Sequence, residues 1–399
     1  MMPSSRWNPL PPIPDHEGFA GSFAGVAHGA LIVAGGANFP GKRPWEGGTK
    51  VWHDTVFVLE KPGGAWRPAG KLPQALGYGV SVTTKAGVVC IGGSNAQGHH
   101  TGVFLLSWRD SQLVIASLPP LPRPCANMSG ALVGNTLCVA GGIGHPDSTS
   151  ALKSFWMLDI EDTEGGSQPP GAASQTTDNR VRRPQSTWRE LEPWPGPGRM
   201  LATAGACDGS FFLFSGAALR AGPDGKPVRE WLRDAYRYTP GRGWRRIADL
   251  PRVSVAAPSP APVFRNSGEA PAFQAAATAG TAQQSRDAKA ASTLQQTGTG
   301  SPAAISAHAG GLESGFLLVI GGDDGAQVNT PPTAHRGFPR DVLAYDPKAD
   351  VWRVAGEAPF SLVTTTAVEW NGRIVIPGGE ARPGVRSPEV WTFEPACSH

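Results

Sequence analysis

Residues 377–386, which read PGGEARPGVR, place a carboxylate and two guanidinium groups close together in the chain. Glu380 comes directly after a pair of glycines, and Arg382 and Arg386 follow it. A carboxylate held beside arginines can accept and return a proton, while the arginines can bind an anionic ligand through charge-assisted hydrogen bonds. A purely structural ion pair is the alternative interpretation. The segment therefore predicts either an acid–base site for a polar, anionic ligand or a stabilising ion pair.

Several other loops carry residues suited to ligand binding. The longest, Gly35–Asp54, reads GGANFPGKRPWEGGTKVWHD and mixes aromatic with charged side chains. Long loops of this kind carry function more often than short connections do. The candidate ligand-binding residues in these loops are Asn38, Phe39, Arg43, Trp45, Tyr78, Arg336 and Arg382.

A repeated strand must position these loops. Six apolar runs each end in a pair of small residues: LIVAGG (Leu31–Gly36), VVCIGG (Val88–Gly93), LCVAGG (Leu137–Gly142), FFLFSGA (Phe211–Ala217), LLVIGG (Leu317–Gly322) and IVIPGG (Ile374–Gly379). Most repeats carry a Trp further along, at Trp66, Trp188, Trp244 and Trp352. An apolar strand that ends in Gly-Gly, followed by a Trp on a later strand, resembles the kelch repeat, in which each repeat is a four-stranded antiparallel blade. The chain is therefore predicted to be an all-β protein, a six-bladed kelch-type β-propeller.

The two ends of the chain are expected to complete one blade. After the sixth Gly-Gly, only one further strand, Glu389–Phe393, precedes the C-terminus. Trp7 in the segment Ser4–Leu10 stands before a Pro-rich connection, as the outer-strand tryptophans of other repeats do. We expect Ser4–Leu10 to pair with Glu389–Phe393, because this pairing closes the ring without free sheet edges. Residues 1–399 then form a single propeller domain.

Two segments interrupt the repeat. Residues 161–186 are polar and lack a strand pattern, and residues 265–310 are rich in Ala, Gln, Ser, Thr and Gly. A low-complexity segment cannot bury enough apolar surface to offset the entropy of ordering, so residues 265–310 are expected to be disordered. The order of strands in an antiparallel blade puts both insertions on one face. The loops after the Gly-Gly pairs, including the one with Glu380, then open on the other face.

The composition of the chain limits its partners and its location. The 399 residues carry a formal net charge of +3, and the basic residues are scattered, which argues against a nucleic-acid-binding surface. No apolar stretch is long enough to span a membrane. The five cysteines form no CxxC pair, and the N-terminus lacks the apolar core of a secretory signal. We expect a cytoplasmic location, with a periplasmic or exported protein made from a longer precursor as the alternative; the oligomeric state is left open.

Three segments resemble one family of kelch proteins. PGGEARPGVR is similar to the NGEAKPGLR stretch of the N-acetylneuraminate epimerases, the sialic acid mutarotases. GGANFPGKR resembles the family's GGAGF-G-R loop, and LGYGVS resembles its RAYGVS stretch, with Leu76 in place of the Arg. The GGANF blade comes first here and the Glu380 blade last, so the chain resembles the cyclically permuted mutarotase group. The resemblance implies that Glu380 is the catalytic glutamate and that Arg386 is the catalytic-site arginine.

The family reaction interconverts the α and β anomers of free N-acetylneuraminate through ring opening, rotation about the C2–C3 bond and reclosure. The resemblance implies that Glu380 takes the proton of the anomeric hydroxyl and that Arg386 binds the substrate carboxylate, supported by Arg382 or Arg336. Aromatic residues such as Phe39 and Trp45 are then expected to pack on the sugar, and no metal or organic cofactor is needed.

Other functions remain as alternatives to this interpretation. The main one is a non-catalytic kelch module that binds a protein or a carbohydrate. A sialidase propeller would carry repeated Ser-x-Asp-x-Gly-x-x-Trp turns, which the sequence lacks. A copper oxidase of the galactose-oxidase kind would need a crosslinked Tyr–Cys pair with further His and Tyr ligands, and none of the four tyrosines stands in such a set.

Overall fold

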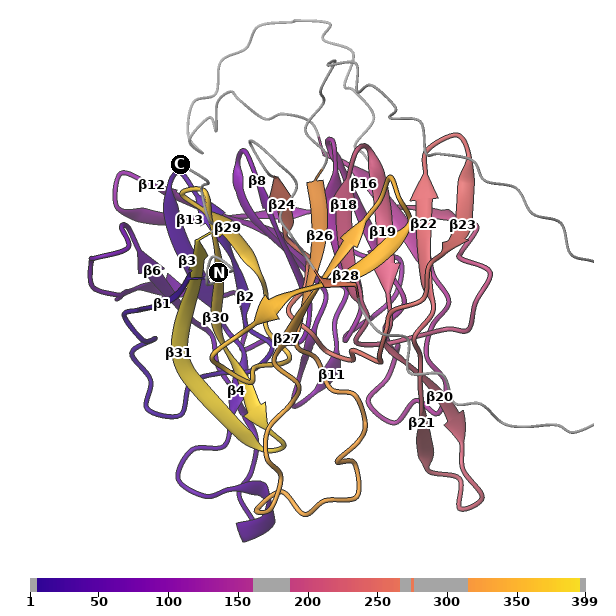
Figure 1. Cartoon of the computed structure of the whole chain (residues 1–399). Coiled ribbons are helices and arrows are strands. Elements are labelled where there is room, and N and C mark those ends of the chain that lie inside the picture. Colours follow the sequence, from indigo (N-terminus) through magenta and orange to yellow (C-terminus); the bar gives the residue numbers. More distant parts are fainter. Residues whose placement is uncertain (1–5, 161–186, 266–273, 276–314, 395–399) are drawn as a thin grey trace, which may run out of the picture.

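Six antiparallel sheets are arranged around a common axis, which confirms the predicted six-bladed propeller (Figure 1). The computed structural model describes residues 6–160, 187–265, 274–275 and 315–394. Within these residues the only helical element is a single 3₁₀ turn, η1 (Pro44–Glu46). We number the blades 1 to 6 along the chain.

Each blade is an antiparallel sheet of four strands, to which blade 5 adds a short fifth strand, β25 (Gln274–Ala275). The innermost strands contact one another between blades 1 and 2, 2 and 3, 3 and 4, 4 and 5, and 6 and 1. Written from the innermost strand outward, the blades are: blade 1, β2 (Phe23–Ala27), β3 (Ala30–Ala34), β6 (Thr55–Leu59) and β7 (Arg67–Lys71); blade 2, β8 (Val80–Thr84), β9 (Gly87–Ile91), β12 (Val103–Arg109) and β13 (Gln112–Leu118); blade 3, β14 (Ser129–Val133), β15 (Thr136–Ala140), β16 (Phe155–Asp159) and β17 (Arg189–Leu191); blade 4, β18 (Thr203–Cys207), β19 (Ser210–Phe214), β22 (Ala235–Thr239) and β23 (Gly243–Ile247); blade 5, β24 (Val263–Arg265), β26 (Gly315–Ile320), β27 (Asp341–Asp346) and β28 (Val351–Glu357); blade 6, β29 (Val368–Trp370), β30 (Arg373–Arg382), β31 (Val385–Glu394) and β1 (Arg6–Leu10).

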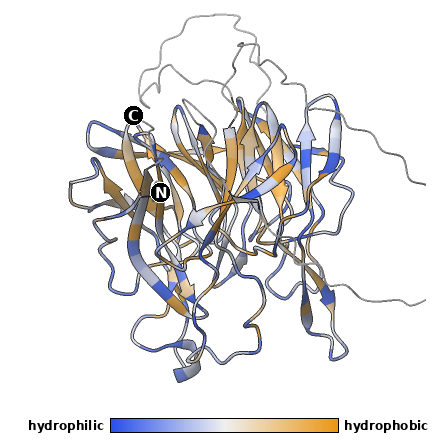
Figure 2. Cartoon of the chain, viewed as in Figure 1, coloured by the Kyte–Doolittle hydropathy of each residue, from blue (hydrophilic) through white to orange (hydrophobic). Residues whose placement is uncertain are grey.

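The apolar runs form the second strand of each blade. Strands β3, β9, β19 and β26 are buried along their whole length, as expected for a strand covered on both faces by neighbouring blades. Figure 2 shows apolar residues concentrated along the strands, with hydrophilic residues at the turns. The core is therefore a set of layers between blades.

Tryptophans on, or directly before, the outer strands link neighbouring blades. The indole N–H of each donates 2.7–3.0 Å to a backbone carbonyl in the connection that leaves the preceding blade; the pairs are Trp66 with Pro11, Trp188 with Pro119, Trp244 with Glu192 and Trp352 with Ala248. Each tryptophan thus fills the gap between two blades and also satisfies a carbonyl that the blades would otherwise bury. This repeated contact explains why the Trp recurs in the sequence.

The N-terminal strand completes blade 6, as the sequence predicts. Trp7 of β1 pairs with Phe393 of β31, and Leu10 pairs with Val390. The Trp7 ring is half-buried and meets Phe360 edge-on at 4.9 Å between centroids. The last blade is therefore built from both ends of the chain.

A ring of backbone hydrogen bonds joins the six blades around the axis. In each blade one residue ahead of the innermost strand has a left-handed backbone, with φ between 53° and 68°. It lies two positions before the strand in blades 1 to 4, seven positions before β24 and four positions before β29. The N–H of each such residue donates 2.7–2.8 Å to the carbonyl of its counterpart in the preceding blade. The bonds run through Gly21, Tyr78, Asn127, Leu201, Ala256 and Thr364, and return from Gly21 to Thr364. We call these six residues the hydrogen-bonded ring.

The two predicted insertions interrupt blades 3 and 5 at turns of one face. Residues 161–186 fall between β16 and β17 and lie outside the described residues. The second segment begins at Arg265, which is the last residue of β24, and Gln274–Ala275 form β25, which pairs with the outer strand β28. The remainder of residues 265–310 lies outside the described residues. The opposite face carries the loops that follow the Gly-Gly pairs.

Three of those loops contain small hairpins. They are β4 (Ala37–Asn38) with β5 (Val51–Trp52), β10 (Ser94–Asn95) with β11 (Gly98–His99), and β20 (Ala217–Ala221) with β21 (Pro227–Trp231). In Figure 1, β4 and the β20–β21 hairpin lie on the lower side of the view. These hairpins extend the face that carries the loops after the Gly-Gly pairs.

Candidate functional site

A cavity of about 1050 Å³ opens on the face formed by the loops after the Gly-Gly pairs. All six blades contribute residues to it. Its lining includes five members of the hydrogen-bonded ring: Tyr78, Asn127, Leu201, Ala256 and Thr364. The cavity therefore lies over the propeller axis, where the loops of all blades converge.

Glu380 and Arg386 reach this cavity from the long hairpin β30–β31 of blade 6. Arg386 Nη1 donates to Glu380 Oε1 at 2.7 Å, and the N–H of Gly384 in the hairpin turn donates to the same oxygen at 2.8 Å. Gly384 has a φ of 77°, and a side chain there would strike the ring of Pro44. The Glu380 side chain is 20% exposed and that of Arg386 only 4%, so the carboxylate is the more accessible partner.

Arg386 is held by contacts from blade 6 to the loops of blades 1 and 2. Its Nε donates to the Ala37 carbonyl at 3.3 Å, and its Nη2 donates to the Tyr78 hydroxyl oxygen at 3.4 Å. Its guanidinium carbon lies 5.0 Å from the centre of the Phe39 ring. Burial is the largest single influence and lowers the pKa of Arg386, but the interactions with Glu380 and Tyr78 together outweigh it, so the pKa lies above its ordinary value. Arg386 is therefore a fixed cation.

Lys50 is a second cation at the same end of the cavity. Its Nζ lies 5.0 Å from the ring centre of Tyr78, 5.4 Å from that of Trp52 and 5.9 Å from that of Phe39. Cations are attracted to the faces of aromatic rings at such distances. No carboxylate of the described residues forms an ion pair with Lys50, whereas Arg386 is paired with Glu380. The positive charge of Lys50 is thus available to an anionic ligand.

Two cavity-lining side chains have buried polar atoms without partners. The indole nitrogen of Trp52 and both ring nitrogens of His99 make no hydrogen bond within the described part of the chain. Burial lowers the pKa of His99, which favours the neutral ring. A buried polar atom without a partner costs free energy, so a ligand that supplies the partner gains affinity. These atoms are suited to hydroxyl or amide groups.

Asp323 and Arg229 line the cavity from blades 5 and 4. Asp323 comes directly after the Gly-Gly of blade 5 and is half-buried, and its Oδ1 accepts a hydrogen bond from the Gly325 N–H at 3.0 Å. Burial is the largest cause that raises the pKa of Asp323 above its ordinary value, while Arg229 and His335 oppose it. The cavity therefore holds two carboxylates in different surroundings.

Four residues of the predicted site come together in this cavity: Phe39, Tyr78, Glu380 and Arg386. Asn38, by contrast, is 1% exposed and lies behind the lining. Its amide nitrogen donates to the Gly18 carbonyl at 3.0 Å, and its Oδ1 lies 2.8 Å from His53 Nε2. Asn38 therefore fixes the base of the blade 1 loop.

The other predicted residues lie around the cavity without lining it. Arg43 forms an ion pair with Glu17, and Trp45 is 37% exposed on η1. Trp45 packs against the Gly384 turn, since a side chain at Gly384 would come within 3.0 Å of it. The remaining two predicted residues, Arg336 and Arg382, have exposed side chains outside the lining.

Sequence reasoning missed Lys50, His99 and Arg229. Lys50 and Trp52 are two positions apart in an extended segment, so they share one side, while Val51 between them is exposed. This alternation is the signal that could have identified Lys50. Arg229 lies on the β20–β21 hairpin, which no repeat motif predicts.

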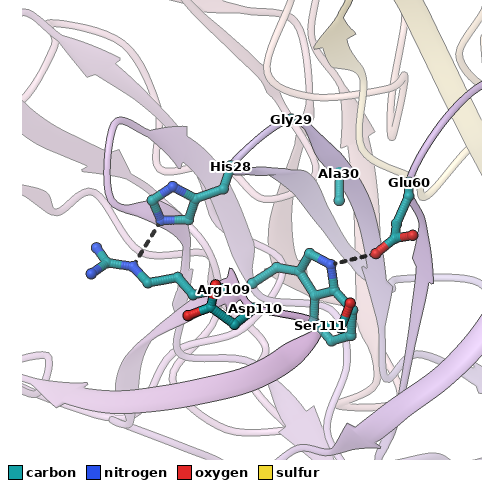
Figure 3. Close-up of a pocket in the computed structure, with 8 residues that line it drawn as sticks. His28, Gly29, Ala30, Glu60, Arg109, Asp110 and Ser111 are labelled. Carbon is teal, nitrogen blue, oxygen red and sulfur yellow. Dashed lines mark hydrogen bonds between the residues drawn. The ribbon is translucent and has the colours of Figure 1, made fainter.

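A second pocket, of about 780 Å³, lies on the opposite face between blades 1 and 2 (Figure 3). There Arg109 Nε donates to His28 Nε2 at 3.0 Å, and Trp108 Nε1 donates to Glu60 Oε1 at 3.1 Å. Arg67 forms an ion pair with the same glutamate. The polar groups of this second pocket thus bond mainly to each other, so the cavity over the axis is the better candidate site.

Neither a metal-binding cluster nor a membrane-spanning helix occurs among the described residues. No group of three or more His, Cys, Asp or Glu side chains there is arranged to hold a metal ion. Among the same residues no helix has the length and apolar character that crossing a membrane requires.

Comparison with known proteins links part of the chain to one family. The model of the family described as N-acetylneuraminate epimerase matches residues 4–115. The chain is 44% identical over 119 residues to the N-acetylneuraminate epimerase of Salmonella enteritidis, across 27% of this chain and 30% of the relative. It is 41% identical over 128 residues to the N-acetylneuraminate epimerase of Yersinia pestis, across 28% of this chain and 32% of the relative.

These similarities cover less than a third of each protein's length. The stretch matched by the family model contains Phe39, Lys50, Trp52 and Tyr78, and therefore one side of the cavity. Glu380 and Arg386 lie outside it.

Proposed function

We propose that the protein is an epimerase that interconverts the α and β anomers of free N-acetylneuraminate. The observation that carries the proposal is the Glu380–Arg386 pair, 2.7 Å apart, facing a cavity whose other wall is built by the residues similar to N-acetylneuraminate epimerases. Exchange of anomers needs a proton acceptor, an anion-binding group and room for an open-chain sugar. The cavity supplies all three.

Glu380 is the proposed proton acceptor. Its Oε1 is held by Arg386 and by the Gly384 N–H, so the carboxylate has a fixed direction. In the ring-opening step the carboxylate takes the proton of the anomeric hydroxyl, the C2–O bond to the ring oxygen breaks, that oxygen takes a proton from water or a neighbouring acid, and C2 becomes a ketone. Rotation about C2–C3 and reclosure on the other face of the ketone give the opposite anomer. Glu380 returns the proton in the closing step.

Lys50 and Arg386 are the proposed binding groups for the substrate carboxylate. Of the five N–H donors of Arg386, three already bond to Ala37, Glu380 and Tyr78. The remaining two can meet an anion, but the charge of Arg386 is shared with Glu380. Lys50 adds a cation that has no carboxylate partner among the described residues. We therefore assign most of the long-range attraction for the anion to Lys50, and orientation to Arg386.

Other residues that line the cavity are suited to bind the neutral parts of the sugar. Phe39 and Trp52 offer ring faces for the apolar side of the sugar and for the N-acetyl methyl group. Trp52 Nε1 and the ring nitrogens of His99 can bond to hydroxyl or amide groups of the substrate.

A proton NMR time course on freshly released α-anomer tests the proposal. With protein present, the β-anomer signals should appear faster than in buffer, and Glu380→Gln should remove the acceleration. Equal rates with and without protein would reject the epimerase, and the propeller would then be a binding module.

A further inference from the structure

Asp323 and Glu380 occupy the same position in neighbouring blades. In every blade the residue directly after the Gly-Gly, or after Ser215-Gly216 in blade 4, forms a backbone bridge to the residue that precedes the member of the hydrogen-bonded ring. The six residues at this position are Ala37, Ser94, Ile143, Ala217, Asp323 and Glu380. Only the last two are ionisable, and both line the cavity.

The two carboxylates are one step apart around the propeller axis. Glu380 and Val363 exchange backbone hydrogen bonds of 2.8 and 3.0 Å, and Asp323 and Val255 exchange bonds of 2.7 and 2.8 Å. Thr364 follows Val363, and Ala256 follows Val255. The Thr364 N–H donates to the Ala256 carbonyl at 2.7 Å, and this bond of the hydrogen-bonded ring connects the two residue pairs. The pseudo-symmetry therefore presents both side chains to the same ligand from adjacent blades.

The two carboxyl groups differ in their surroundings. Glu380 forms an ion pair with Arg386. None of the described residues forms an ion pair with Asp323, and its burial raises its pKa, which favours the protonated acid. Two carboxyl groups with such different environments are the usual basis for one base and one acid in a single site.

We propose that Asp323 is the proton donor to the ring oxygen, acting opposite Glu380. The inference rests on the proposed epimerase function. When the ring opens, Glu380 takes the proton of the anomeric hydroxyl, the bond between C2 and the ring oxygen breaks, and the Asp323 proton moves to that oxygen. Glu380 is then protonated and Asp323 is a carboxylate. Reclosure reverses both transfers, so no net proton is consumed.

The test compares Asp323→Asn with Asp324→Asn. Asp324 is the neighbouring residue in the same loop, and its carboxylate accepts from the Ala326 N–H outside the cavity lining. Asp323→Asn keeps the shape but cannot donate an acidic proton, so kcat should fall about 10²-fold or more, with KM within about threefold of wild type. Asp324→Asn should lower kcat far less, because it removes only a charge that helps to raise the pKa of Asp323. Asp323→Glu should recover part of the rate, since it restores the acid.

A second readout separates proton donation from support of the loop. The solvent deuterium isotope effect on kcat should be large in the wild type and should change in Asp323→Asn, because proton transfer by this group is then absent. A rise in KM with unchanged kcat, or a wild-type rate in Asp323→Asn, would overturn the inference. If the wild-type protein itself does not accelerate mutarotation, the proposed function fails, whatever the variants do.

Discussion

Glu380 and Arg386 stand directly opposite each other across the β30–β31 hairpin, and register irregularities flank the pair on the side of Pro377 and again towards Arg382. Such irregularities bend a hairpin and redirect side chains, and they are frequent beside active sites. Both members of the ion pair line the cavity over the propeller axis. The pairing fixes a carboxylate at the cavity surface while it buries the guanidinium beneath it.

The first prediction concerns Glu380→Gln. Glutamine keeps the size and one acceptor oxygen but is not a base, so kcat for mutarotation should fall by about 10²- to 10⁴-fold with KM little changed. Line-shape or exchange NMR on both anomers measures this. Glu389→Gln on the partner strand β31 is the matched control, since Glu389 is exposed and lies outside the cavity. A wild-type rate in Glu380→Gln would exclude the carboxylate as the base.

The second prediction compares the two arginines of the hairpin. Arg386→Ala removes contacts to Glu380, Tyr78 and Ala37, so it should weaken substrate binding by about 1.5–3 kcal/mol, the usual contribution of a charge-assisted hydrogen bond, and should also lower kcat. Arg386→Lys should recover only part, because a lysine cannot make the planar pair of bonds. Arg382→Ala should leave both constants near wild type, since Arg382 is exposed. If Arg386→Ala and Arg382→Ala changed kcat and KM equally, Arg386 would not be the arginine that binds the substrate.

The sequence predicted the ring of blades well because each motif has one structural use. A Gly-Gly after a buried strand and a Trp before the next blade determine local packing, and local packing repeated six times determines the ring. The pairing of β1 with β31 was predictable for the same reason, since Trp7 repeats the position of the other tryptophans.

The site was less predictable because it depends on contacts between blades. Glu380 and Tyr78 meet around Arg386 although 302 positions separate them in the numbering, 380 minus 78. Nothing in the sequence around Asn38 shows that its amide is used by Gly18 and His53. Lys50 was overlooked because its role comes from three aromatic rings, one of which follows in the next blade.

The third prediction concerns Lys50→Met. Methionine keeps the length and the contact with the rings but removes the charge, so KM for the sialate should rise about 10- to 100-fold while kcat stays within about threefold. The methyl ester of the sugar, which lacks the negative charge, should be handled equally poorly by wild type and variant. Lys42→Met is the control, because Lys42 lies in the same loop but is exposed outside the cavity. An unchanged KM in Lys50→Met would assign the anion to another group.

The fourth prediction concerns closure of the ring. Trp7→Ala removes a half-buried ring that packs on Phe360 and Phe393, so it should destabilise the protein by about 2 kcal/mol, less than the 3–5 kcal/mol typical of a fully buried aromatic residue. Deletion of residues 1–10 should lower the melting temperature further, because it also exposes the edge of β31. Asn8→Ala, an exposed change on the same strand, should have little effect. A truncated protein that melts like the wild type would show that β1 contributes nothing to stability.

The last prediction concerns the segment between β24 and β26. Arg265 and Gly315, the residues that flank 266–314, are direct partners across these two strands, so a short Gly/Ser turn can join them without moving either strand. This turn belongs to the face opposite the cavity, so its replacement should leave kcat and KM within about twofold of wild type and cost only the short pairing of β25 with β28. Replacing Pro40–Gly48 in the blade 1 loop is the matched contrast: it removes η1, which packs against the Gly384 turn, and should sharply reduce activity. Melting curves and NMR exchange rates on both variants provide the comparison. A large loss of activity in a folded variant without residues 266–314 would mean that this segment reaches the cavity face.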